Sequence, residues 1–124
     1  MTSSQQPGRN PSRLASLENA FKGLKVLLSQ PNARIHIAVA ILVVFLGWKF
    51  SISRLEWLSV VLVIALVITA EALNTAIELV VNLLSPQWQP LARDIKDVAA
   101  AAVLISSLGA AVVGWLVFAP HFFA

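Results

Sequence analysis

Two carboxylates, two amides and a hydroxyl recur at helical spacing within one apolar stretch of the chain. At about 100° per residue, the five side chains fall within a band of roughly 100° on one helix face. They are Glu71, Asn74, Thr75, Glu78 and Asn82. Carboxylates at membrane depth are costly and are retained mainly where they act in function. We therefore predict a functional site on this face of a membrane-embedded helix.

Further charged side chains stand at the start of the next apolar stretch. Lys96 offers a cation, and Asp94 and Asp97 offer additional carboxylate oxygens. Such oxygen ligands suit a hard divalent metal such as Mg²⁺ and a polyanionic substrate held through the metal. The alternative is purely structural: Glu71 and Glu78 pair with Lys96 and Arg93 to hold two helices together.

The composition places this chain in a bilayer. Of its 124 residues, 58% are hydrophobic and only 12% are charged, against about 25% charged residues in an ordinary soluble domain. The net charge of +3 reflects topology and anionic lipid, and we expect no nucleic-acid partner. The chain has no Cys, which excludes disulfides and thiolate chemistry, and it contains neither a P-loop nor an HExxH motif.

The elements that must position these side chains are helices. Residues 1–12 form a flexible tail, and residues 13–29 form an amphipathic helix on the membrane surface. The apolar residues of that helix recur at steps of three and four: Leu14, Leu17, Phe21, Leu24 and Leu28. A soluble helix packed on a partner is the alternative interpretation. Pro31 ends this helix.

Three membrane-spanning helices follow, over about 33–50, 55–84 and 90–118. An all-α integral membrane protein is therefore predicted, with a single domain from residue 13 to residue 124. A lone protomer would turn its polar face to lipid, so self-association is expected.

The distribution of basic residues predicts the orientation. Seven are predicted to lie on the side of the membrane that holds the N-terminus: Arg9, Arg13, Lys22, Lys25, Arg34, Arg93 and Lys96. Only Lys49 and Arg54 lie on the other side. Positive residues favour the cytoplasmic side. The N-terminus and both polar clusters are thus expected in the cytoplasm, where ATP is found.

Several segments together resemble the prokaryotic diacylglycerol kinase family, which includes undecaprenol kinases. They are Glu71 to Glu78 (EALNTAIE), Lys96-Asp97, Phe21 to Leu24 and Asn32 to His36. The resemblance implies a homotrimer with shared active sites in the bacterial inner membrane. It implies transfer of the γ-phosphate of ATP to a lipid hydroxyl, from diacylglycerol to phosphatidic acid or from undecaprenol to undecaprenyl phosphate.

The resemblance also implies a role for each matching residue. Glu71 corresponds to the general base, which takes the proton of the lipid hydroxyl. Glu78 corresponds to a ligand of Mg²⁺ on the nucleotide phosphates, and Lys96 to the residue that neutralises those phosphates. Asn74 and Asp97 correspond to residues that orient and support the nucleotide.

Two positions depart from the family pattern. Gln30 stands where many members have a metal-binding Glu, and Asn82 stands where an Asp is common, so an inactive scaffold of this fold is a rival hypothesis. Asn82 and Arg34 are candidate supporting residues. The run from Arg34 to His36 is more similar to the undecaprenol-type branch. Taken alone, His36 is interpreted as a packing or interfacial histidine.

A small ion- or proton-conducting protein is the rival from another class, with Glu71 and Glu78 as a relay. Such a relay requires further ionisable residues across the other spans. Residues 98–118 contain none, and the stretch 35–48 contains only His36, near one end. The sequence therefore favours the kinase.

Overall fold

The computed structural model describes residues 12–123, and this part of the chain is almost entirely helical. The helices are α1 (Arg13–Leu28), α2 (Pro31–Lys49), α3 (Arg54–Leu84) and α4 (Pro90–Phe122). Three of them, α2, α3 and α4, are long and apolar enough to cross a membrane. The predicted all-α fold with three spanning helices is confirmed. The predicted tail lies outside the described residues, apart from Ser12.

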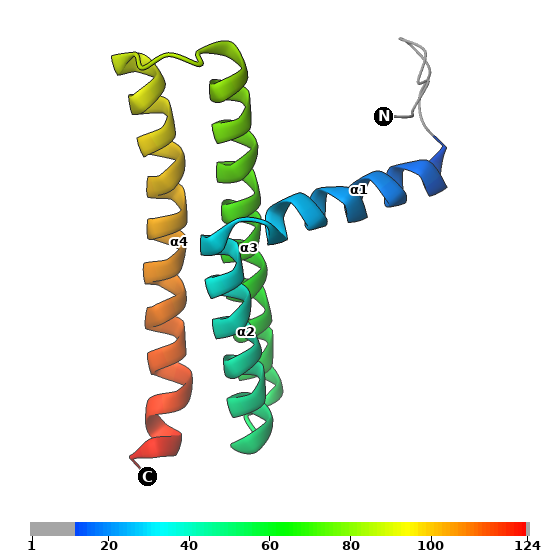
Figure 1. The fold of residues 1–124 in the computed structure, drawn as a ribbon. Helices are drawn as coiled ribbons and strands as arrows, with labels where there is room; N and C mark the ends of the chain where they lie inside the picture. The colour runs from blue at the N-terminus through cyan, green and yellow to red at the C-terminus, as the bar shows by residue number, and fades with distance from the viewer. Residues whose placement is uncertain (1–11, 124) are drawn as a thin grey trace.

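Helix α1 leaves the three-helix bundle sideways (Figure 1). Its first turn is capped by Ser12, whose Oγ accepts a hydrogen bond from the Ala15 amide at 3.2 Å. The helix contacts α2 and α3, and its one buried side chain is Leu27. The predicted apolar stripe, from Leu14 to Leu28, is exposed. A free apolar stripe of this size requires a lipid surface or a partner.

The spanning helices begin at residues suited to a helix N-terminus. Pro31 and Pro90 occupy first-turn positions of α2 and α4, where the missing amide hydrogen costs nothing. Helix α3 begins with a capping box: Ser53 Oγ accepts from the Glu56 amide at 3.2 Å, and Glu56 Oε1 accepts from the Ser53 amide at 3.0 Å. The tight turn before α3 contains Ser51 at a φ of 51°.

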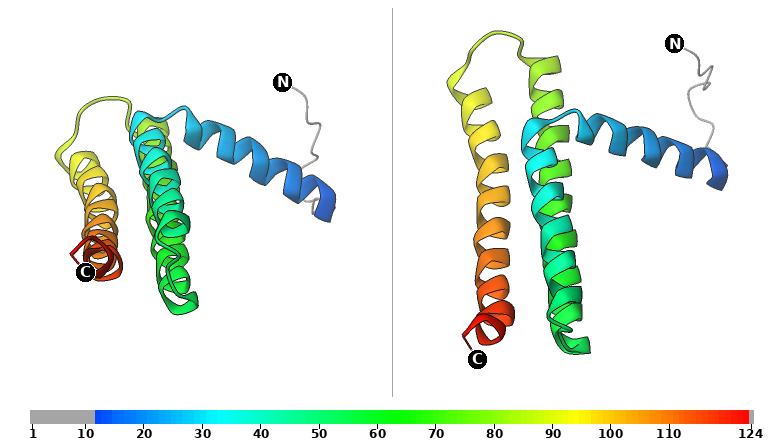
Figure 2. Two further views of the ribbon diagram at one scale, coloured as in Figure 1. Left: turned by 90° about the horizontal axis from the view of Figure 1, so that it is seen from below. Right: turned by 60° about the horizontal axis from the view of Figure 1, so that its bottom comes forward.

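Helix α3 packs against both α2 and α4. A cluster of buried hydrophobic residues lies toward the end that holds the α2–α3 turn and the C-terminus of α4 (Figure 2). Its buried residues are Ile52, Val60, Val117 and Phe118. At the other end, α3 and α4 continue well past the corner between α1 and α2 (Figure 1). The polar last third of α3 therefore extends beyond the level of α1.

Candidate active site

The polar face predicted on α3 is partly buried within a single protomer. Glu71, Asn74 and Thr75 are buried, Glu78 is half-buried and Asn82 is exposed. The Thr75 hydroxyl donates to the backbone carbonyl of Glu71 at 3.0 Å, and Asn74 Nδ2 donates to Glu78 Oε1 at 3.4 Å. The face therefore runs from a buried acid to an exposed amide.

The carboxylate of Glu71 lies beside a histidine from another helix. Nε2 of His36, on α2, is 3.6 Å from Oε2 of Glu71. The small space around the pair is otherwise lined by apolar residues: Leu27, Ala33, Ile37 and Ile68. Leu27 and Ala33 are themselves buried, so the α1–α2 corner covers this acid.

A second polar group joins the end of α3 to the start of α4. Lys96 Nζ donates to Asn82 Oδ1 at 2.6 Å, and Arg93 Nε pairs with Asp97 Oδ1 at 3.2 Å on the exposed surface of α4. Neither Glu71 nor Glu78 forms an ion pair with Lys96 or Arg93 among residues 12–123. The structure thus gives no support to the purely structural alternative.

Within one protomer, the predicted site residues do not converge on a single point. Asn82, which holds Lys96, follows Glu71 by three turns of helix, or ~16 Å along the axis. The pair of Asn74 and Glu78 lies between them. The described chain therefore has a carboxylate at one end of the face and a cation at the other.

The two predicted residues on the α1–α2 corner, Gln30 and Arg34, make few contacts with the polar face of α3. Gln30 is the N-cap residue of α2, and its side chain makes no capping hydrogen bond. Arg34 Nη2 donates to the Ser29 carbonyl at 3.2 Å in an exposed position. No contact between either residue and Glu71 or Glu78 occurs among the described hydrogen bonds and ion pairs.

The donor set on α3 fits a hard metal that is also held by nucleotide phosphates. In the described chain, no three His, Asp or Glu side chains cluster as a complete protein metal site. Asn74 Oδ1, however, is buried and has no hydrogen-bond partner there, and it belongs to the amide that contacts Glu78. Carboxylate and amide oxygens with phosphate oxygens are the usual environment of Mg²⁺.

Comparison with known proteins identifies the family. The family model described as prokaryotic diacylglycerol kinase matches residues 18–118. The chain belongs to this family. An undecaprenol kinase of Bacillus subtilis is 36% identical over 106 residues, which cover 85% of this chain and 86% of that protein. A diacylglycerol kinase of Synechocystis is 33% identical over 112 residues, covering 89% of this chain but only 64% of that protein.

As a family member, this chain is a membrane-embedded lipid kinase, an enzyme that transfers a phosphoryl group to an alcohol. The resemblance drawn from the EALNTAIE run and from Lys96-Asp97 is thus confirmed at the level of the family. The roles of the individual residues remain predictions.

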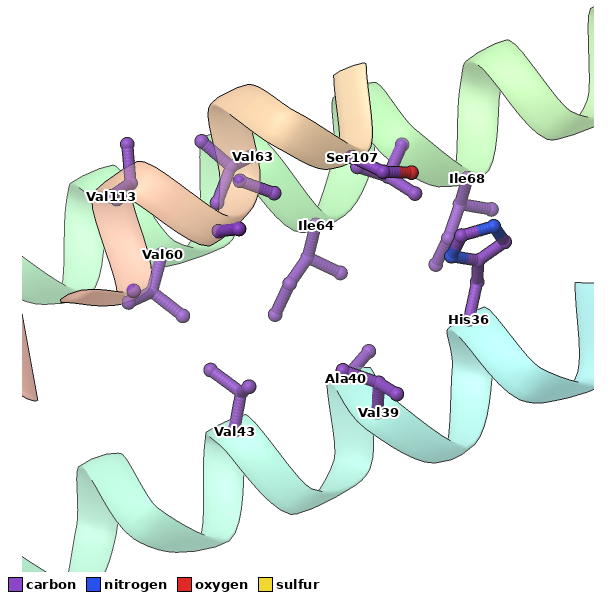
Figure 3. A pocket seen from close by; sticks show the side chains of 14 residues that line it. His36, Val39, Ala40, Val43, Val60, Val63, Ile64, Ile68, Ser107 and Val113 are labelled. Carbon is purple, nitrogen blue, oxygen red and sulfur yellow. The ribbon is translucent and has the colours of Figure 1, made fainter. Parts of the chain in front are cut away.

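The kinase has an apolar groove beside this site, between α2, α3 and α4 (Figure 3). Its volume is about 270 Å³, and its lining is almost entirely small or β-branched. Ser107 and His36 are the polar residues of the lining. His36 stands at one end of the groove, with Val43 toward the other (Figure 3). Since His36 also contacts Glu71, it lies where the groove meets the acid.

Sequence reasoning missed two histidine contacts of this kinase. The His36 contact bridges helices α2 and α3, and a signal for it existed, since His36 is an ionisable residue within an otherwise apolar span. The other contact joins His121 Nε2 and Glu56 Oε2 at 3.3 Å. It lies at the opposite end of the bundle, between residues far apart in the sequence.

Proposed function

We propose that this kinase transfers the γ-phosphate of ATP to the hydroxyl of a membrane lipid, either diacylglycerol or undecaprenol. The products are phosphatidic acid and undecaprenyl phosphate respectively. The observation that carries the proposal is the buried carboxylate of Glu71, set in apolar surroundings at a distance from the cationic end of the same helix face. This carboxylate is placed to receive an acceptor hydroxyl that arrives from lipid, and the cationic end of the face lies toward a nucleotide that arrives from water.

In the proposed reaction, Glu71 takes the proton of the lipid hydroxyl as its oxygen attacks the γ-phosphorus. The new bond joins the lipid oxygen to the γ-phosphorus. The bond from the γ-phosphorus to the oxygen that bridges it to the β-phosphate breaks, and ADP leaves with the negative charge on that oxygen. Lys96, held by Asn82, neutralises charge on the phosphates. Phosphoryl transfer depends mainly on positioning and charge neutralisation, which side chains on helix faces can supply without a P-loop.

Glu78, together with Asn74, is the proposed holder of Mg²⁺, and Gln30 is a candidate further ligand. The metal supplies positive charge on the phosphate oxygens when bound. Asp97 and Arg34 are proposed to support the nucleotide end. Since Gln30 is neutral where many relatives have an acid, metal binding is expected to be weaker here than in those relatives.

The working unit is proposed to be a homotrimer in the bacterial inner membrane, with the N-terminus and the active site in the cytoplasm. The charge asymmetry along the sequence supports the orientation. The exposed apolar stripe of α1 supports its placement on the membrane surface. The separation of Glu71 from Lys96 within one protomer supports an active site completed by a neighbouring subunit.

The test is a direct assay of the purified chain in lipid micelles. Labelled ATP and Mg²⁺ are supplied with diacylglycerol in one reaction and with undecaprenol in another. A labelled lipid phosphate is expected from at least one acceptor, and its identity names the substrate. Absence of product from both lipids, at several Mg²⁺ concentrations, would contradict the proposal and favour an inactive scaffold.

A further inference from the structure

We infer that His36 is a positioning residue for Glu71: its imidazole compensates the buried carboxylate and fixes the orientation in which Glu71 receives the acceptor proton. The inference rests on the proposed function. It starts from one contact, with Nε2 of His36 at 3.6 Å from Oε2 of Glu71. This distance is longer than a hydrogen bond, but it is short for an electrostatic interaction with a buried carboxylate.

The carboxylate of Glu71 has little other compensation. Its side chain is only 4% exposed, and the space around it is walled by apolar residues of α1, α2 and α3. Thr75 bonds to the backbone carbonyl of Glu71 and not to its carboxylate. Among residues 12–123, His36 is the one basic side chain within 4.0 Å of this acid.

A general base requires this compensation. Burying a charged carboxylate in apolar surroundings is costly unless a cation or a hydrogen-bond donor lies beside it. At 3.6 Å the His36 imidazole is close enough to interact electrostatically with the carboxylate, and a small approach of the two groups would form a hydrogen bond. The nearest carboxylate oxygen to the imidazole is Oε2, and Oε1 is the oxygen that we assign to the proton of the lipid hydroxyl.

The placement of His36 also suits the approach of the acceptor. The residue lines both the apolar groove and the small space around Glu71, whereas Glu71 lines only the latter. The imidazole, with its side chain 25% exposed, contacts the carboxylate of Glu71 and lies at one end of the groove (Figure 3). A substitution of His36 is therefore expected to lower kcat while the fold is kept.

The test compares two substitutions in the full-length enzyme, on whichever lipid the wild type phosphorylates. His36→Ala removes the partner of Glu71, so kcat is expected to fall by about 10- to 100-fold, a part of what a general base contributes. The KM values for ATP and lipid are expected to change less than twofold. His36→Gln, whose amide can donate from nearly the position of Nε2, is expected to retain most of kcat. Added imidazole is expected to restore turnover to His36→Ala.

The matched control is His121→Ala, at the other end of the bundle, which is expected to keep wild-type kcat. Three results would overturn the inference: unchanged kcat in His36→Ala, a change confined to the lipid KM, or an equal loss in His36→Gln without rescue by imidazole. A wild-type enzyme that phosphorylates neither lipid would overturn the proposed function as well. Activity of the wild type together with any of the three results overturns only the role of His36.

Discussion

The kinase contains two histidine–carboxylate pairs, one near each end of the bundle, and their surroundings differ far more than their distances. His36 and Glu71 are 3.6 Å apart, and His121 and Glu56 are 3.3 Å apart. The Glu56 side chain is 30% exposed, whereas that of Glu71 is 4% exposed. Glu56 also accepts a hydrogen bond from the Ser53 amide. Glu56 is therefore tied into a helix cap, whereas Glu71 is buried with His36 as its basic partner among the described residues.

The packing around the pair of His121 and Glu56 explains the contrast. The ring of Phe50 lies 5.9 Å from that of His121 and contacts Phe118 and Phe122 at 6.5 and 4.8 Å between centroids. These contacts join the ends of α2 and α4 beside the start of α3. Here the carboxylate of Glu56 is committed to capping and to its histidine. Glu71 takes part in no such cap, and it is at this end that we propose the active site.

The sharpest test of the comparison exchanges each acid for its amide. Glu71→Gln is expected to lower kcat by 10³-fold or more, because the amide cannot accept the proton. Glu56→Gln is expected to stay within twofold, since Gln also serves at the third position of a capping box. Both are measured as labelled lipid phosphate per enzyme. Equal losses in the two variants would remove the functional distinction between the ends.

A smaller effect is expected at the nucleotide end of the site. Lys96→Met removes the cation held by Asn82, and kcat is expected to fall by about 10²-fold as phosphate charge is left unneutralised. Arg54→Met is the control, because that side chain is exposed at the start of α3, at the opposite end of the helix. Both rates are measured at saturating ATP. An equal loss in Arg54→Met would contradict the assignment of the nucleotide phosphates to Lys96.

The structural role of the end that holds the α2–α3 turn can be tested through its packing. A Cβ on Gly47 would lie 2.8 Å from Cη2 of Trp57 and 3.0 Å from Cδ1 of Ile52. Gly47→Ala is therefore expected to cost about 1–3 kcal/mol of stability, seen as a lower midpoint of thermal unfolding in detergent. Gly109→Ala, where a Cβ meets nothing within 4 Å, is the control. Activity below the midpoint should be kept, and a loss of kcat there would contradict the division between the ends.

The smallest expected effect concerns the capping box. Ser53→Ala removes the acceptor for the Glu56 amide and is expected to cost about 1 kcal/mol. Ser59→Ala is the matched control, because the Ser59 hydroxyl donates to the Leu55 carbonyl within its own helix. Thermal unfolding of both variants provides the measurement. An equal cost at Ser59 would show that the box itself contributes nothing.

The sequence predicts those features that leave a periodic or compositional pattern. Long apolar runs predict spanning helices because the bilayer requires them, and the 3.6-residue period places Glu71, Asn74 and Glu78 on one face. Family resemblance then names the chemistry.

Contacts between helices leave no such pattern. The pairing of His36 with Glu71, and that of Asn82 with Lys96, depends on how each helix is rotated and crosses its neighbour. Those rotations are set by many small apolar contacts, such as those of Ala33 and Leu27, which carry no local signal. For this reason the contact of His36 with Glu71, on which its proposed role rests, is not predicted from the sequence, where His36 is interpreted as a packing or interfacial histidine.

The unequal lengths of the spanning helices have a mechanical consequence. Helix α2 has 19 residues and α3 has 31, or ~28 Å and ~46 Å of helix, against a hydrocarbon core of about 30 Å. Of the three spanning helices, α2 is the one with no length to spare. With α1 resting on the membrane as proposed, a thicker bilayer would strain α2 or be thinned around it and would shift Glu71 relative to the lipid headgroups. Turnover is therefore expected to depend on the thickness of the bilayer.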